Sequence, residues 1–127
     1  MRTVVAIAAL LAATAGPARA DLMRARDVVD GCDIVSANEQ TFARCMSYVQ
    51  GLMDGFYRVD QSFVEETNTR DGFLGLCLPK NGVRGDMLVD QVKTHIEKVP
   101  RDAGLPARTV IFAILQREYP CTGGAKP

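Results

Sequence analysis

The chain of 127 residues carries 15 basic and 15 acidic side chains, which are interspersed along its length, and its formal net charge is zero. It lacks the clustered lysines and arginines that neutralise nucleic-acid phosphates, which argues against nucleic acid as a partner. Its length is that of one small domain, whose limited core gains from covalent cross-links.

The N-terminal residues have the three parts of a cleavable export signal. Arg2 provides the basic start, an apolar run follows from Val4 to Ala15, and the small-residue triplet Ala18-Arg19-Ala20 provides the cleavage site. The apolar run is shorter than the roughly 20 residues that a membrane-spanning helix needs. The sequence therefore predicts a signal peptide over 1–20 and a single mature domain over 21–127, which is exported from the cytoplasm and not held in a membrane.

The mature chain begins with a short helix, expected over about 22–35 and interrupted at Gly31. Its apolar residues recur at helical spacing, so we expect one side of the helix to face the core. The residues on that side are Val28, Val29, Cys32 and Val35.

The clearest amphipathic segment covers about 39–64, where apolar residues recur at three- and four-residue steps. The stripe is interrupted only by Asp60 and consists of Phe42, Cys45, Met46, Val49, Leu52, Met53, Phe56, Tyr57, Phe63 and Val64. Gly51 and Gly55 lie opposite the stripe, and each glycine costs a helix roughly 1 kcal/mol relative to alanine. Close approach of another backbone would offset that cost. We therefore expect a central helix contacted on two sides, with Gly51 and Gly55 facing either another helix or a partner chain.

Residues 65–84 form the longest stretch without helical periodicity. A connection of this length in a small domain is often functional, and an ordinary connection held by Cys77 explains it equally well. It contains four apolar residues that either pack inward or form a short strand: Phe73, Leu74, Leu76 and Leu78.

Two further helices are expected over about 85–99 and 106–119. Pro100 ends the first of them, and Pro106 and Pro120 mark the start and end of the second, because proline suits the first helical turn and cannot continue a helix. Their inward stripes are Leu88, Val92, Ile96 and Val99, and Ala107, Val110, Ile111, Ile114 and Leu115. The sequence as a whole predicts an all-α fold, a small bundle of about four helices.

Four cysteines follow the signal peptide: Cys32, Cys45, Cys77 and Cys121. An even number of cysteines in an exported chain predicts two disulfides, each contributing roughly 2–4 kcal/mol. Zinc ligation is disfavoured because no pair has the C-x-x-C spacing. The short turn between the first two helices favours the pairs Cys32–Cys45 and Cys77–Cys121, while Cys32–Cys77 with Cys45–Cys121 stays open.

The sequence predicts no catalytic centre, metal site or cofactor site. The single histidine, His95, lies at the edge of an apolar stripe and is expected to be a hydrogen-bonded residue at the border of the core. A Cys-His nucleophile would need a free thiol, and the carboxylates of Glu65-Glu66 and of Asp86 with Asp90 are expected to be solvated. The chain is therefore expected to act by binding and not as an enzyme.

Three motifs of the mature chain together resemble one known family. They are Cys45-Met46-Ser47-Tyr48-Val49-Gln50-Gly51-Leu52-Met53-Asp54-Gly55, then Phe73-Leu74-Gly75-Leu76-Cys77-Leu78-Pro79, and the closing Tyr119-Pro120-Cys121. With the signal peptide and the early cysteine, they are similar to the Tai/Rap family of type VI secretion immunity proteins. The resemblance covers nearly the whole mature chain, with Arg84 standing where the family typically has a helix-capping threonine.

The resemblance implies a small helical periplasmic protein, often a homodimer, that protects a bacterium from peptidoglycan-cleaving amidase effectors. Such an inhibitor occupies the active-site groove of the effector, where a Cys-His pair cuts the peptide stem, and needs no catalytic residue of its own. The alternative is a periplasmic stress or chaperone-like helical protein that exposes apolar surface on acidification.

For an inhibitor, the segment expected to contact the effector is one that protrudes and carries polar groups. The residues that fit this description best are Glu65, Glu66, Asn68, Arg70 and Asp71. The alternative is a solvated loop without a partner.

Overall fold

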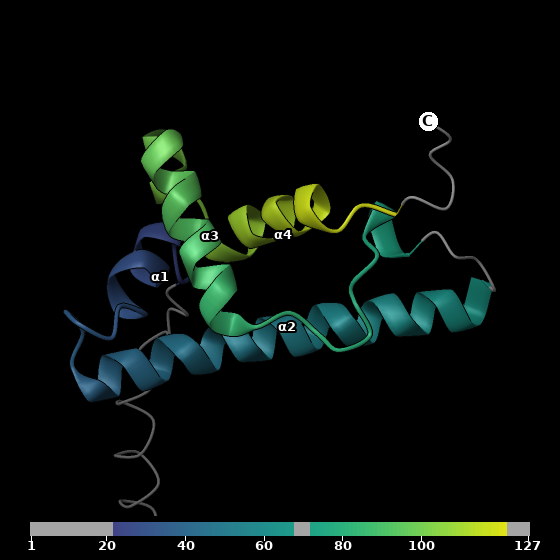
Figure 1. Ribbon diagram of the computed structural model, residues 1–127, viewed down its shortest axis with the longest axis horizontal. Helices are drawn as coiled ribbons and strands as arrows, with labels where there is room; N and C mark the ends of the chain where they lie inside the picture. Colours follow the sequence, from purple (N-terminus) through teal and green to yellow (C-terminus); the bar gives the residue numbers. More distant parts are fainter. Residues whose placement is uncertain (1–21, 68–71, 122–127) are drawn as a thin grey trace, which may run out of the picture.

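The computed structural model describes residues 22–67 and 72–121 (Figure 1). Its elements in chain order are α1 (Ala25–Gly31), α2 (Glu39–Thr67), the 3-10 helix η1 (Phe73–Gly75), α3 (Gly85–Lys98), the 3-10 helix η2 (Pro100–Gly104) and α4 (Ala107–Glu118). Within these ranges the only strand-like features are two isolated bridges, Arg24 with Pro106 and Leu76 with Pro120. The predicted all-α fold of about four helices is confirmed.

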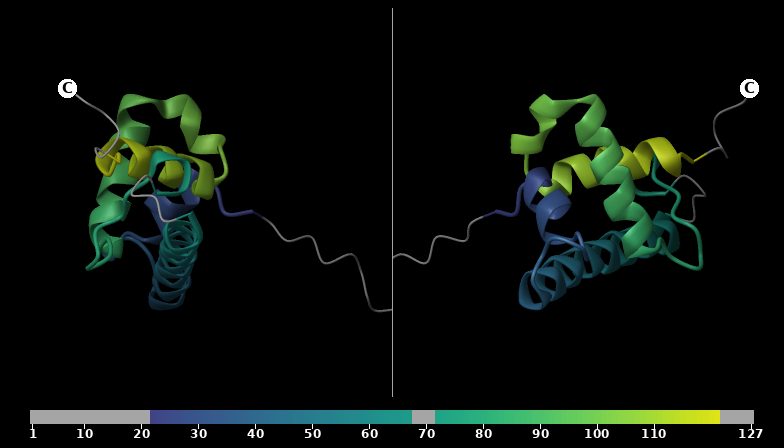
Figure 2. Two further views of the ribbon diagram at one scale, coloured as in Figure 1. Left: turned by 90° about the vertical axis from the view of Figure 1, so that its right-hand side faces the viewer. Right: turned by 60° about the vertical axis from the view of Figure 1, so that its left-hand side comes forward.

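The long helix α2 forms one side of the molecule, and α1, α3 and α4 all lie on the same side of it (Figure 1). The views in Figure 2 show the same arrangement from other directions. A Cβ built at Gly51 or Gly55 would meet no atom within 4 Å. Within the described residues, no other helix of this chain packs against the glycine side of α2, so the second contact predicted for this helix is left to a partner chain.

The core lies where α1, α3 and α4 meet the inner side of α2. Val49 of α2, Leu88 and Val92 of α3, and Ile111 and Ile114 of α4 are fully buried. Burial of each such side chain contributes roughly 1.5–3 kcal/mol. The apolar stripes predicted for these helices thus form the interfaces that hold the bundle together.

The start of α1 is tied to the start of α4, which shortens α1 relative to the expected helix. Met23 O accepts a hydrogen bond from Ala107 N at 2.8 Å, and Ala25 N donates to Leu105 O at 2.9 Å. The residues before Ala25 are therefore extended beside the chain that leads into α4.

The chain turns after Gly31, where α1 ends. Asp33 Oδ1 accepts a hydrogen bond from Val35 N at 2.9 Å, which stabilises the turn. Val28 and Cys32 are buried as expected, whereas Val35 is 90% exposed. The prediction that Val35 faces the core is therefore wrong.

Two disulfides connect parts of the chain that are distant in sequence. Cys32–Cys45 joins the end of α1 to α2, and Cys77–Cys121 joins the chain after η1 to the end of α4. The pairing that the sequence favours is confirmed. Because all four cysteines are paired, none is available as a nucleophile or as a zinc ligand.

His95 lies near the end of α3 and contacts η2. Its Nε2 atom is 2.8 Å from Asp102 Oδ2, and the two side chains are partly buried. The pair ties the last turn of α3 to η2. The prediction of a hydrogen-bonded histidine at the border of the core is confirmed.

Candidate partner-binding surface

Residues 72–78, which we call the pinned loop, are held against the C-terminal end of α4. The Cα atoms of the disulfide Cys77–Cys121 are 4.9 Å apart. Cys121 N donates a hydrogen bond to Gly75 O and Cys77 N donates to Tyr119 O, each at 2.9 Å. One covalent bond and two backbone hydrogen bonds therefore fix the position of this loop on the helical bundle.

Leu74 lies at the exposed tip of the pinned loop in a left-handed backbone conformation. Its φ and ψ angles are 54° and 34°, a region that costs a residue other than glycine roughly 1–2 kcal/mol. Gln116 Nε2 donates a hydrogen bond to Leu74 O at 3.1 Å, which helps to hold this conformation. The Leu74 side chain is 62% exposed. Strained residues of this kind cluster at binding sites, where the surrounding structure holds them in place.

The two expectations for the apolar residues of this segment are only partly met. Leu76 is buried at 1% exposure and Leu78 is half-buried, as inward packing predicts, whereas inward packing of Leu74 is wrong. The strand alternative is also wrong, because residues 73–75 form the 3-10 helix η1. The difference arises because consecutive residues of a tight helical turn point in different directions, so Leu74 faces outward while Leu76 enters the core.

Leu74 borders a shallow apolar groove between α2, α4 and the pinned loop, which we call the Leu74 groove. Its volume is about 360 Å³, and its lining consists of Leu52, Phe56, Leu74, Arg108, Thr109 and Phe112. The rings of Phe56 and Phe112 contact each other in this lining, with centroids 5.5 Å apart. The lining is mainly apolar, which suits contact with an apolar side chain of a protein partner.

Arg108 is the one charged residue that lines the Leu74 groove. Its side chain is exposed, and the ion pairs formed by the described residues involve other cations. Burial raises the pKa of the neighbouring Tyr48 hydroxyl, and the positive charge of Arg108 opposes that rise. The groove therefore offers apolar contact together with one cation for an anionic group of a partner.

Gly51 and Gly55 continue this surface along α2. At 100° per residue, Val59 lies between Gly55 and Leu52 around the helix, and its side chain is 45% exposed. Of the two alternatives for the glycines, packing against another helix of this chain does not occur within the described ranges. Contact with a partner chain stays a prediction.

The polar segment predicted to contact a partner directly precedes the pinned loop. Glu65 and Glu66 belong to the last turns of α2 and not to an irregular loop, because the helix extends to Thr67. Asn68, Arg70 and Asp71 lie outside the described residues. The role of these five residues in binding stays a prediction.

The residues of the Leu74 groove are absent from the candidate binding residues that the sequence provides. Leu52, Phe56 and Phe112 come from two helices that meet only in the folded chain. A local signal exists for Leu74 alone: Gly75 follows it with φ of 76°, and Leu-Gly between apolar residues is compatible with a tight turn.

One protein family matches the chain. The profile of the Rap1a immunity proteins matches residues 20–121, which is most of its length. The chain belongs to this family. No curated protein and no solved structure matches significantly.

Membership of the Rap1a family confirms the resemblance found in the motifs, and it implies that the protein binds a partner effector. Immunity proteins of this kind typically act without catalysis. Two disulfides fit a secreted or periplasmic protein, since disulfides persist in oxidising compartments. None of the helices formed by residues 22–67 and 72–121 is long and apolar enough to cross a membrane.

Proposed function

We propose that this Rap1a family protein is a periplasmic immunity protein that binds and blocks the active site of a peptidoglycan amidase effector delivered by type VI secretion. The observation that carries the proposal is the family match over residues 20–121. The proposal includes removal of the signal peptide over 1–20 and a stoichiometric complex with the effector.

The Leu74 groove supports a blocking role because it combines a protruding anchor with a rigid support. Interface energy concentrates in a few residues that become fully desolvated on binding. Leu74 is exposed before binding, and the disulfide at Cys77 limits the conformational entropy that binding would remove. We assign the effector contact to the Leu74 groove together with the preceding segment from Glu65 to Asp71.

The proposal is tested with the oxidised protein and the type VI amidase effectors encoded in the same genome. We expect one of them to form a one-to-one complex and to lose its ability to cleave peptidoglycan when the complex forms. If none of these effectors binds or is inhibited, the proposed function is wrong.

Replacing Leu74 with asparagine tests its contact with the effector without destabilising the fold. Asparagine tolerates the left-handed region better than leucine, so we expect unchanged or slightly higher thermal stability. Loss of an interface anchor costs at least about 2 kcal/mol, so the Kd for the effector should rise about 30-fold. Calorimetric titration measures the Kd.

The matched control for this change is Leu22→Asn. Leu22 is 54% exposed and does not line the Leu74 groove, so its replacement should leave the Kd within about twofold. An unchanged Kd for Leu74→Asn would remove Leu74 from the contact, whatever the effector.

We further propose that the protein is a homodimer in which the open side of α2 around Gly51 and Gly55 meets a second copy. Leucine at these positions is expected to stabilise the monomer by up to about 1 kcal/mol, because it favours helix and a Cβ at either position has no atom of another element within 4 Å. It should also prevent close approach of two helices. Sedimentation equilibrium of Gly51→Leu should therefore show a monomer at concentrations where the unchanged protein is a dimer.

Ala43→Leu is the control for the dimer, because Ala43 is exposed on α2 away from the glycines. It should leave the association constant unchanged. A wild-type protein that stays monomeric at high concentration, or a Gly51→Leu variant that dimerises normally, would contradict the proposed dimer.

A further inference from the structure

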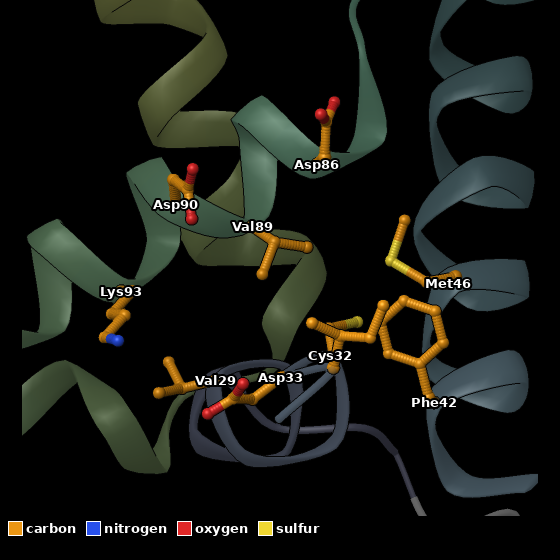
Figure 3. A pocket seen from close by; sticks show the side chains of 10 residues that line it. Val29, Cys32, Asp33, Phe42, Met46, Asp86, Val89, Asp90 and Lys93 are labelled. Carbon is orange, nitrogen blue, oxygen red and sulfur yellow. The ribbon is translucent and has the colours of Figure 1, made fainter. Parts of the chain in front are cut away.

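A hollow of about 280 Å³ lies between α1, the first half of α2 and α3 (Figure 3). Apolar side chains from all three elements line it, among them Val29, Phe42, Met46 and Val89. Met46 precedes Phe56 by ten residues, which corresponds to roughly 15 Å along a helix. The hollow is therefore separate from the Leu74 groove, and we call it the acidic hollow for the residues at its rim.

Three carboxylates and one ammonium group line the hollow: Asp33, Asp86, Asp90 and Lys93. Hydrogen bonds from Val35 N and the Ser36 hydroxyl hold the pKa of Asp33 below its usual value. The rim of the hollow therefore carries a net negative charge near neutral pH.

The negative charge of the rim is only partly compensated within the protein. Arg84 forms an ion pair with Asp86 and lowers the pKa of that carboxyl. Asp90 has no ion pair or side-chain hydrogen bond with any described residue. Figure 3 shows Asp90 and Lys93 on α3 and Asp33 on the chain after α1, and the positive charge of Lys93 also contributes to the lowered pKa of Asp33.

One apolar residue of the lining is already exposed to solvent: Ile34 is 76% exposed. The hollow is smaller than most sites for drug-sized ligands, which start at roughly 300 Å³. Its size and largely apolar lining suit one large side chain of a protein partner, because protein interfaces combine an apolar centre with a charged rim.

We propose that the acidic hollow is a docking site for a basic segment of a partner protein, with an apolar side chain on the floor and a flanking arginine or lysine beside Asp90 and Asp33. Charge complementarity selects this partner, since the rim would repel an acidic segment. The hollow lies outside the surface assigned to the effector contact, so a protein bound through Leu74 retains a second site.

The test uses two-dimensional NMR spectra of the isotopically labelled, oxidised full chain at low ionic strength. The probe is a capped five-residue peptide with leucine between two arginines and glycine at each end. We expect saturable shifts of the amides of residues that line the hollow. Peptides with serine in place of leucine, or with glutamates in place of the arginines, should bind at least about fivefold more weakly.

Two opposite charge changes test the rim directly. Asp90→Lys should weaken binding of the arginine peptide about fivefold, and Lys93→Glu should strengthen it by a similar factor. Asp54→Lys makes the same change of charge on α2 outside the hollow and should leave binding within about twofold. The dispersion of each spectrum reports whether the variant is folded.

The proposal is overturned if the glutamate peptide binds as tightly as the arginine peptide, if the shifts map elsewhere, or if both charge changes leave affinity unchanged. These outcomes do not involve an amidase, so failure of the docking site and failure of the proposed immunity function are distinguishable.

Discussion

Replacing Cys77 and Cys121 together with alanine is expected to lower the free energy of unfolding by about 4 kcal/mol. The two cysteines are 44 residues apart, and the loop-closure entropy of the unfolded chain rises with that separation. The same double replacement at Cys32 and Cys45, which are 13 residues apart, should cost about 3 kcal/mol. Urea denaturation of the two double variants measures the difference.

The Cys77–Cys121 disulfide should also have a local effect that the other disulfide lacks. Without it, the hydrogen bond from Cys77 N to Tyr119 O and the one from Cys121 N to Gly75 O are the main links between the pinned loop and α4. We expect these two amides to lose most of their protection against hydrogen exchange, while the amide of Val92 in α3 stays protected. Equal protection of the loop in both double variants would mean that the disulfide does not hold the Leu74 groove.

The sequence predicts best those helices in which the apolar stripe and the residues that start and end a helix indicate the same bounds. The predicted stripe of α3 is Leu88, Val92, Ile96 and Val99, that of α4 consists of five residues between Ala107 and Leu115, and prolines stand near the ends of both helices. The five α4 residues, Leu88 and Val92 are buried, and Ile96 and Val99 are half-buried, as the helical periodicity predicts. The favoured disulfide pairing follows from the same local geometry, because a short turn brings Cys32 close to Cys45.

Other features depend on contacts or turns that apolar periodicity does not encode. The Leu74 groove forms only because a disulfide and three hydrogen bonds bring residues 72–78 against α4. Val35 was expected inside because its spacing fits a helix, but the turn at Asp33 directs the chain outward. Tertiary contacts therefore form the Leu74 groove, whereas a local turn overrides the helical periodicity at Val35.

Asp60 shows both a local sequence pattern and a tertiary contact. It interrupts the predicted apolar stripe of α2, and in the folded chain it is buried at 8% exposure beside the pinned loop. A buried carboxylate is costly unless neighbouring groups stabilise it. Its position explains why one polar residue occurs in an otherwise apolar stripe: its carboxylate lies beside the backbone of the loop at Gly72.

Gly72 makes this close approach possible, and replacing it with alanine is expected to lower the free energy of unfolding by about 3 kcal/mol. A Cβ at this position would overlap both Leu76 O and Asp60 Oδ1. Removing the Asp60 side chain would not make enough room, because the carbonyl of Leu76 belongs to the backbone. The pinned loop must therefore move, and Leu74 moves with it.

The control is Gly104→Ala, where an added Cβ would meet no atom within 4 Å. Without a clash, alanine at this position restricts the unfolded chain and should stabilise the protein by about 0.4–1 kcal/mol if the backbone accommodates it. The midpoints of thermal and urea denaturation of the two variants should therefore shift in opposite directions.

Gly72→Ala should also weaken effector binding, because the displaced loop no longer presents Leu74. We expect Gly72→Ala to lose both affinity and stability, and Leu74→Asn to lose affinity alone. This difference would show that Gly72 supports the binding surface, whereas Leu74 contacts the effector. Full stability and full affinity of Gly72→Ala would show that the loop is not held where the structure places it.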